Sequence, residues 1–260
     1  MEIQGKTALV TGASRGLGAA LARGLARDGA RVLLVARGAE ALEETAESIR
    51  RDGGEAYAIA ADLGDKSAIH RIAGEAAALA GSVDILIHDA ATLGPVPMPL
   101  LSDTACEDLE AVLAVNLIGP FRLTRALLGA MILRGGGLVM SITSDASIEA
   151  YPGWGAYGVS KAALEHLTRI WAAETEGTGV RLVTVDPGEM DTVMHAEALP
   201  EADRSALPAP EDAARAILER IRAIEETPNG ARIDLAGAVA AAARERETEE
   251  ARRAAASASR

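Results

Sequence analysis

The stretch Thr11-Gly12-Ala13-Ser14-Arg15-Gly16-Leu17-Gly18 decides the fold, because it joins an apolar run at residues 6–11 to a segment with helical spacing at residues 16–28. Glycine allows the backbone to turn tightly between a strand and a helix, and free N–H groups at a helix start bind phosphate. The spacing G-x-x-x-G-x-G is one residue wider than the usual dinucleotide fingerprint. Its position predicts a nucleotide-binding loop, and a purely structural turn is the alternative interpretation.

Strand-like and helix-like segments then alternate along the chain. Short apolar runs predict strands at residues 6–11, 31–36, 55–60, 83–88, 137–142, 180–185 and 231–235. Longer stretches with helical spacing predict helices at residues 16–28, 40–52, 67–80, 104–133, 156–176 and 210–225. Most of the strand candidates are continuously apolar, which is typical of strands covered on both faces. The pattern predicts an α/β fold in which a parallel sheet lies between two layers of helices.

No linker rich in Pro, Gly or Ser divides the chain, so we predict one dinucleotide-binding and catalytic domain over residues 1–237. Within it, residues 189–208 are irregular and contain two prolines. Such a segment suits a substrate lid, and a surface connection explains it equally well. Residues 238–260 form a tail of Ala, Arg and Glu, which we interpret as a solvated helix or a frayed end, with a subunit contact less favoured.

Composition excludes several classes of protein. The 260 residues are 49% hydrophobic and 25% charged, as in ordinary globular proteins, and 26 basic against 38 acidic side chains give a net charge of −12. An acidic chain repels phosphate backbones, so we expect no nucleic-acid or membrane partner. Cys106 is the only cysteine, and the first residues lack a signal-peptide pattern. The longest stretch without charged residues is 90–102, and since a membrane span needs about 20 apolar residues, we expect no membrane-spanning segment. We therefore expect a soluble cytoplasmic protein without an intramolecular disulfide.

The choice of nucleotide depends on the end of the second predicted strand. An acidic residue there would accept a hydrogen bond from the ribose 2′-hydroxyl of NAD, but this chain has Arg37. Arg37 and Arg15 of the glycine loop can pair with a 2′-phosphate, which predicts that NADP(H) is preferred, with NAD(H) as a secondary cofactor. Asp62, after the third strand, could accept a hydrogen bond from the adenine amino group, or simply begin a helix.

Tyr157 and Lys161 are four residues apart and therefore share one face of a predicted helix. A free phenol titrates near pH 10, too high for acid–base work at neutrality. A cation about 4 Å away contributes roughly 4 kcal/mol at an effective dielectric of 20, which predicts a depressed Tyr157 pKa and an acid for a developing alkoxide. Ser144 follows the fifth strand, where ligands of open α/β sheets bind, although a serine at such a place is usually a turn residue.

Taken together, these residues resemble the classical short-chain dehydrogenase/reductase family over residues 5–237. The glycine loop resembles its T-G-x-x-x-G-x-G, and Tyr157 to Lys161 resembles its Y-x-x-S-K, with Ser144 thirteen positions earlier. Asn116 is similar to the family's helix asparagine, and Pro187-Gly188 with Thr192 is similar to its P-G-x-x-x-T segment.

The resemblance implies a single Rossmann-type, doubly wound domain with a seven-stranded parallel sheet and helices on both faces. It implies hydride transfer between a nicotinamide and a small-molecule carbonyl or alcohol, by a homotetramer or homodimer. Tyr157 would be the acid/base, Lys161 would lower its pKa, Ser144 would polarise the carbonyl and Asn116 would hold a water of a proton relay. The implied cofactor-binding residues are Gly12, Ser14, Arg15, Gly16, Leu17, Gly18, Arg37, Asp62, Leu63, Ala90, Tyr157, Lys161, Pro187, Gly188 and Thr192.

The chain departs from the family pattern after the fourth strand, where His88-Asp89-Ala90-Ala91 replaces N-N-A-G. This change affects the expected loop geometry and adenosine contacts more than the chemistry. His88 has no clustered partners, so we expect no metal site. Asp145, next to Ser144, either selects a donor group on the substrate or faces water.

A mainly apolar substrate pocket is predicted, which suggests a ketone or aldehyde with an apolar body, although some of these side chains will belong to the core. Its residues are Leu93, Val96, Ser147, Tyr151, Trp154, Met190, Val193, Met194 and Leu199. A 3-oxoacyl-carrier-protein reductase and a non-catalytic NADP sensor are the remaining alternatives. An enoyl reductase is disfavoured, because that branch resembles a wider Tyr–Lys spacing.

Overall fold

The computed structural model describes residues 1–258, with side chains as far as Arg246 and that of Thr248. Its centre is one parallel sheet in the strand order β3-β2-β1-β4-β5-β6-β7. The strands are β1 (Thr7–Thr11), β2 (Arg31–Ala36), β3 (Glu55–Ala60), β4 (Ile85–His88), β5 (Gly137–Ile142), β6 (Val180–Asp186) and β7 (Arg232–Asp234). The predicted seven-stranded parallel sheet is confirmed.

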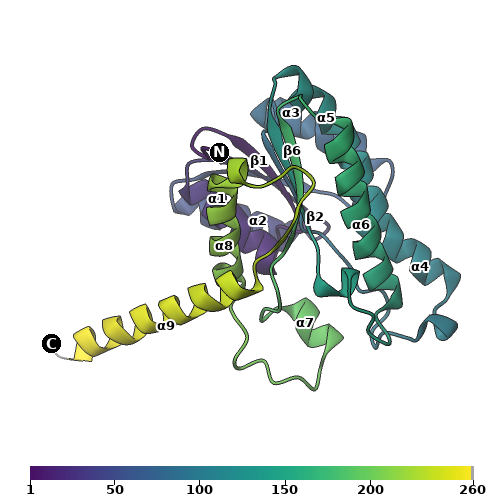
Figure 1. Ribbon diagram of the computed structural model, residues 1–260. Helices are drawn as coiled ribbons and strands as arrows, with labels where there is room; N and C mark the ends of the chain where they lie inside the picture. The colour runs from purple at the N-terminus through teal and green to yellow at the C-terminus, as the bar shows by residue number, and fades with distance from the viewer. Residues whose placement is uncertain (259–260) are drawn as a thin grey trace.

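Helices cover both faces of this sheet, as predicted (Figure 1). One layer contains α1 (Gly16–Arg27), α2 (Ala39–Arg51) and α8 (Pro210–Arg222). The other layer contains α3 (Ala68–Ala80), α5 (Gly119–Leu133) and α6 (Gly155–Glu174).

The alternation of side chains along β1 explains why continuously apolar strands are needed. Leu9 packs with the α3 and α5 layer, whereas Ala8 and Val10 pack with the α1 and α8 layer, and all three are fully buried. Successive strand residues point to opposite faces, so a polar residue at any of these positions would be buried in one of the two cores. These two cores hold the carboxyl ends of the strands in place.

The predicted helix over residues 104–133 is found as one continuous helical segment, Cys106–Leu133, and its middle is wound as a π-helical turn. A short η1 (Leu101–Asp103) is followed by α4 (Cys106–Leu113), a π-helical turn η2 (Ala114–Ile118) and then α5. At the end of this turn, a Cβ on Gly119 would lie 2.9 Å from the Leu63 carbonyl oxygen, so the helix approaches the neighbouring loop closely. π-Helical turns often occur at functional sites. This one carries Asn116.

Cys106–Leu133, taken as one helix, is long and apolar enough to cross a membrane by length and composition. The sequence expectation that no segment meets this criterion is therefore wrong, because it considered only stretches without charged residues. The helix is partly buried: 39% of its apolar stretch lies inside the protein, where Val112, Leu123 and Met131 pack into the core.

Residues 189–208, predicted to be irregular, contain the one-and-a-half-turn helix α7 (Val193–Ala198). Thr192 caps this helix, since its Oγ1 accepts a hydrogen bond from the backbone N–H of His195 at 3.2 Å. Beyond α8 come the short turn η4 (Ile224–Glu226), β7 and the last helix.

The C-terminal tail is the helix α9 (Ala236–Ala258), which extends away from the body of the molecule (Figure 1). Its beginning is anchored, because Val239 is buried and Arg246 pairs with the buried Asp212 of α8 at 3.1 Å. Of the two interpretations, a solvated helix or a frayed end, the helix holds for residues 238–258, and residues 259–260 lie outside the described part.

Candidate active site

A cavity of about 1270 Å³ lies where the carboxyl ends of the strands meet, as expected for an open parallel sheet. The loops after the first six strands all contribute to its wall. Most of the predicted site residues line it together: Gly12, Ser14, Arg15, Gly16, Leu17, Arg37, Asp62, Leu63, Ala90, Leu93, Ser144, Tyr151, Trp154, Tyr157, Lys161, Pro187, Gly188, Met190, Thr192 and Met194. The cavity thus joins the predicted cofactor and substrate residues in one continuous space.

The glycine loop is closed by two tight backbone contacts. Gly12 has φ +73°, and a Cβ there would lie 2.9 Å from the Ala90 backbone nitrogen. A Cβ on Gly18 would lie 2.5 Å from the Gly12 carbonyl oxygen, so Gly18 packs directly against the backbone of the loop. It does not line the cavity. The loop leads into α1 at Gly16, which directs the free N–H groups of the first helical turn toward the cavity.

Arg15 and Arg37 lie at the end of the cavity formed by β1, β2 and β3. Both are exposed, and in the part of the chain that the structure describes neither guanidinium is in an ion pair. Asp62, also in this wall, accepts a hydrogen bond from the Gly64 N–H at 2.8 Å and so holds its own turn.

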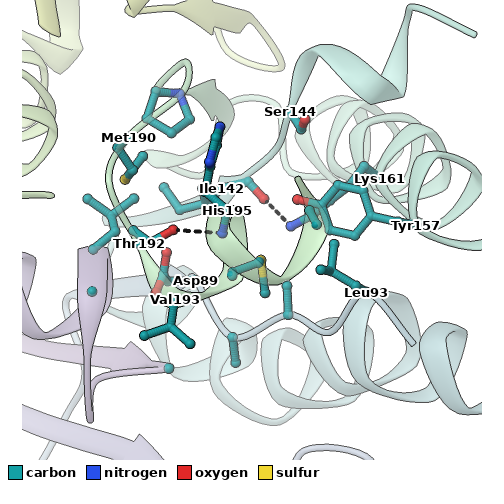
Figure 2. Close-up of a pocket in the computed structure, with 18 of the residues that line it drawn as sticks. Asp89, Leu93, Ile142, Ser144, Tyr157, Lys161, Met190, Thr192, Val193 and His195 are labelled. Atoms are coloured by element: carbon teal, nitrogen blue, oxygen red, sulfur yellow. Dashed lines mark hydrogen bonds between the residues drawn. The ribbon is translucent and has the colours of Figure 1, made fainter. Parts of the chain in front are cut away.

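Tyr157 and Lys161 lie next to each other on α6, as the four-residue spacing predicts (Figure 2). The Lys161 Nζ is 5.4 Å from the centre of the Tyr157 ring and donates a hydrogen bond of 2.8 Å to the Ile142 carbonyl oxygen at the end of β5. Both side chains are buried, and both line the cavity. The residues of the loop after β6, including Met190 and Thr192, form the opposite wall in Figure 2.

The predicted depression of the Tyr157 pKa is wrong for the free protein. Burial, above all, raises the pKa of Tyr157, and the neighbouring carboxylate of Asp89 adds to this shift. Burial also lowers the pKa of Lys161 to about 8, against the opposing attraction of Asp89 and Asp186. The sequence argument considered the ammonium–phenol pair alone, whereas desolvation and the surrounding carboxylates dominate in the structure. Tyr157 is therefore protonated at neutral pH.

Ser144 lies two residues after the end of β5, on the same side of the sheet, and caps the short turn η3 (Asp145–Ser147). Its hydroxyl donates a hydrogen bond of 2.8 Å to Asp145 Oδ1 and accepts one from the Ala146 N–H at 3.2 Å. The oxygen is thereby fixed at the cavity wall, with its proton directed at a carboxylate.

Asn116 is the one proposed catalytic residue that does not line the cavity. It is buried in the π-helical turn, where its side chain bonds to both backbone groups of Thr92 and donates to Ser160 Oγ at 2.9 Å. The amide thus connects the loop after β4 to the helix that carries Tyr157 and Lys161. Its role in a proton relay stays a prediction.

The predicted substrate residues gather at one end of the cavity, except Ser147 and Val96. Ser147 was expected in the pocket, but its hydroxyl points away from the cavity. Its single proton is shared between two acceptors, the Ser144 carbonyl oxygen at 2.6 Å and the buried Glu165 carboxylate at 2.5 Å. Trp154 stacks edge-on between Tyr151 and Tyr157, with ring centres 6.3 and 5.8 Å apart. These rings, with Leu93, Met190 and Met194, form a largely apolar wall.

Several polar residues that line the cavity were not predicted, among them Asp186, Glu189 and His195. Asp186 directly precedes Pro187, so its place at the end of β6 was a usable signal. Glu189 and His195 lie in the loop after β6, with Glu189 Oε1 3.6 Å from His195 Nε2. The His195 Nδ1 is buried without a hydrogen-bond partner, a feature that only the folded arrangement reveals.

The unusual pair His88 and Asp89 is buried or partly buried at the end of β4. His88 Nε2 bonds to Thr124 Oγ1 at 2.8 Å, and burial lowers the pKa of His88 to about 3. Asp89 Oδ2 would lie 2.7 Å from a Cβ on Gly18, and burial raises the pKa of Asp89 to about 7 against the attraction of Lys161. Asp89 thus contacts the glycine loop, and His88 fills a structural position.

We expect Asp89→Asn to change how stability depends on pH. Between about pH 4 and pH 7 the folded protein retains a proton on Asp89 that the unfolded chain has lost, so this group makes stability fall as pH rises through that range. The variant should lack this fall and be more stable than the wild type by about 1–3 kcal/mol at pH 8, with little difference at pH 4. Urea unfolding at both pH values measures this, with the exposed Asp103→Asn as control. An unchanged pH dependence would contradict it.

Known proteins resemble this chain in both sequence and structure. The family model described as short chain dehydrogenase matches residues 6–203. A short chain dehydrogenase of Pseudocercospora fijiensis is 39% identical over 200 residues, which cover 75% of this chain and 63% of that protein, so the chain spans less than two thirds of this relative. The 2-(R)-hydroxypropyl-CoM dehydrogenase of Xanthobacter autotrophicus is 37% identical over 194 residues, covering 73% of this chain and 76% of that protein.

Among solved structures, one from Beutenbergia cavernae superimposes with a TM-score of 0.82 at 31% identity. The match covers 93% of this chain and 100% of that one. It is described as a candidate NAD(P) dependent gluconate 5-dehydrogenase with bound NADP at low occupancy.

Proposed function

Because the chain belongs to the short-chain dehydrogenase family, we propose that it is a nicotinamide-dependent oxidoreductase that interconverts a carbonyl compound and its alcohol. The observation that carries the proposal is that one cavity is lined both by the glycine loop and by the pair Tyr157 and Lys161. The loop fits a dinucleotide, since side chains at Gly12 and Gly18 would collide with neighbouring atoms, and the start of α1 offers N–H groups for a pyrophosphate.

When bound, the cofactor would supply or accept the hydride. Ser144 and Tyr157 would hold the carbonyl oxygen between two hydroxyl groups, and Tyr157 would give its proton to the developing alkoxide. The raised pKa of Tyr157 keeps the phenol protonated at neutral pH, which suits the reductive direction. Lys161, held by the Ile142 carbonyl oxygen, would place positive charge beside the phenolate that remains.

We propose that NADP(H) is preferred to NAD(H). Arg37 follows β2, where the 2′ position of the adenosine ribose would lie, and its guanidinium is free of ion pairs among the described residues. The NADP bound to the similar Beutenbergia cavernae structure supports this assignment.

We expect Arg37→Ala to weaken NADPH binding about 10- to 100-fold, the effect of losing one charge-assisted hydrogen-bond pair, while NADH binding changes less than about twofold. Fluorescence titration with both coenzymes measures the two affinities. Arg51→Ala, an exposed arginine at the end of α2, is the matched control and should alter neither. A wild-type protein that binds NADH as tightly as NADPH would contradict the preference.

The substrate we propose is a ketone or aldehyde with an apolar body, in keeping with the aromatic and methionine side chains of the wall. A 3-oxoacyl-carrier-protein reductase and a non-catalytic NADP-sensing protein are the alternatives. Exposed apolar side chains on α5 and α6, such as Leu133 and Val159, support a homodimer or homotetramer formed through these helices.

A substrate panel tests the proposed function. Aliphatic and aromatic ketones, aldehydes, secondary alcohols and an acetoacetyl thioester are incubated with each coenzyme, and the absorbance of the reduced nicotinamide is followed. We expect turnover of ketones or aldehydes with NADPH. Preference for the thioester would favour the carrier-protein reductase, and cofactor binding without any turnover would favour the sensor.

A further inference from the structure

The carboxylate of Asp145 stands directly beside the serine proposed to hold the substrate oxygen. Its Oδ1 accepts hydrogen bonds from Ser144 Oγ and from the Ala146 N–H, both at 2.8 Å. Its Oδ2 accepts one from the Tyr151 hydroxyl at 3.0 Å, and Asp145 lines the cavity. The carboxylate is therefore held in one orientation at the substrate end of the site.

Asp145 also retains capacity for a ligand. A carboxylate offers about four acceptor positions, and the contacts named above occupy three of them. No cation is paired with Asp145 in the part of the chain that the structure describes. One position on Oδ2 is therefore open to a donor, and the position that Ser144 occupies on Oδ1 becomes open when the serine hydroxyl turns to a substrate oxygen.

The cationic groups of the cavity lie away from this carboxylate. Arg15 and Arg37 are at the dinucleotide end, and Lys161 is held by the Ile142 carbonyl oxygen. The acidic Glu189 lines the substrate end as well, and its side chain is 67% exposed. This end therefore attracts hydrogen-bond donors and repels anionic substituents.

The hydroxyl of Ser144 makes Asp145 relevant to the reaction. In the free protein its proton is directed to Asp145, and it must turn to the substrate oxygen before it can polarise a carbonyl. A substrate donor that reaches Asp145 would replace the serine proton there and free it for the carbonyl. A substrate without a donor also breaks the hydrogen bond between Ser144 and Asp145, but it offers Asp145 no other donor in return.

We propose that Asp145 is a specificity-determining residue that selects carbonyl compounds carrying a hydroxyl or ammonium group on the carbon next to the carbonyl. The proposal rests on the proposed function and names its substrate class. The adjacent carbon is the right position because Ser144 Oγ and Asp145 Oδ1 are 2.8 Å apart, so one substrate can engage both only through neighbouring polar groups.

Matched substrates test this proposal. NADPH-dependent kcat/KM is measured for 2-butanone, for 1-hydroxy-2-butanone and for the ammonium analogue 1-amino-2-butanone, with wild type, Asp145→Ala and Asp145→Asn. We expect the wild type to prefer at least one of the donor-bearing ketones by about 10- to 100-fold, the effect of one hydrogen bond to a charged group. The preference should fall at least tenfold in Asp145→Ala. If Asp145→Asn lowers kcat/KM more for the ammonium substrate than for the hydroxyl substrate, the positive charge of the substrate is the feature that Asp145 selects.

Controls separate this result from a folding defect or a failed function. Asp52→Asn removes an exposed carboxylate at the end of α2 and should keep the substrate ratio, and thermal unfolding and the NADPH Kd verify each variant. The role of Asp145 is overturned, and the proposed function is not, if the wild type reduces 2-butanone with the same kcat/KM as both donor-bearing ketones. The same holds if the preference for the donor-bearing ketones is unchanged in Asp145→Ala. Turnover of no carbonyl compound at all overturns the proposed function itself.

Discussion

Replacing Tyr157 with phenylalanine is expected to lower kcat for carbonyl reduction by about 10²- to 10⁴-fold, the contribution of a positioned general acid. The ring stays in contact with Trp154 and Lys161, so the fold and the cavity wall should be preserved. Only the proton donor is lost. The NADPH Kd should remain within about threefold of the wild type.

Steady-state kinetics with the preferred ketone, together with NADPH fluorescence titration, measure both quantities. Tyr57→Phe is the matched control, because the Tyr57 hydroxyl bonds to Glu55 on the edge strand β3, away from the cavity. It should leave kcat unchanged. Full turnover by Tyr157→Phe would remove the chemical basis of the proposed function.

The parts of this site that are local in sequence could be predicted. The glycine loop is fixed by a strand, a turn and a helix in succession, and the pairing of Tyr157 with Lys161 follows from the four-residue repeat of a helix. The sheet could be predicted for a related reason, since continuously apolar strands separated by amphipathic helices have few other ways to bury both faces.

The parts that depend on contacts between distant segments could not be predicted. The π-helical turn at Asn116 has no signature in the pattern of apolar residues, and it is accompanied by hydrogen bonds to Thr92 and Ser160. Ser147 was predicted to line the substrate pocket, but Glu165, eighteen residues further along the chain, accepts a hydrogen bond from its hydroxyl and holds it away from the cavity. The prediction of a depressed Tyr157 pKa failed for the same reason. The largest causes of the upward shift are burial and the charge of Asp89, and the Y-x-x-x-K motif contains no information about either.

Glu165 belongs to a buried charge network that supports the site from behind. It lies one turn after Lys161 on α6, and its Oε1 accepts hydrogen bonds from Thr143 at 2.7 Å and from Ser147 at 2.5 Å, the residues on either side of the Ser144 turn. Arg232 of β7 bonds to Glu165 at 3.0 Å and to Asp186 at 2.6 Å. One guanidinium thus pairs with two buried carboxylates.

We expect Arg232→Ala to lower the free energy of unfolding by about 3–5 kcal/mol, because removing one partner of a buried ion pair leaves its charges uncompensated. In a protein of this size such a loss lowers Tm by roughly 6–20 °C. The activity of the remaining folded protein should fall as well, since Glu165 would no longer be held behind the Ser144 turn. Urea unfolding, analysed for the midpoint and the slope, measures the stability change.

The pH dependence of the stability loss in Arg232→Ala distinguishes the loss of ion pairs from a simple loss of side-chain packing. Burial raises the pKa of Asp186, and Arg232 opposes that shift, so without the arginine Asp186 should take up a proton more readily. Protonation removes the uncompensated charge, and the gap between variant and wild type should therefore narrow as pH falls. Arg31→Ala is the matched control: it breaks an exposed pair with Glu55 and should cost at most about 1 kcal/mol at any pH. A cost for Arg232→Ala no larger than that of Arg31→Ala, or one that does not change with pH, would show that the network adds nothing beyond ordinary surface contacts.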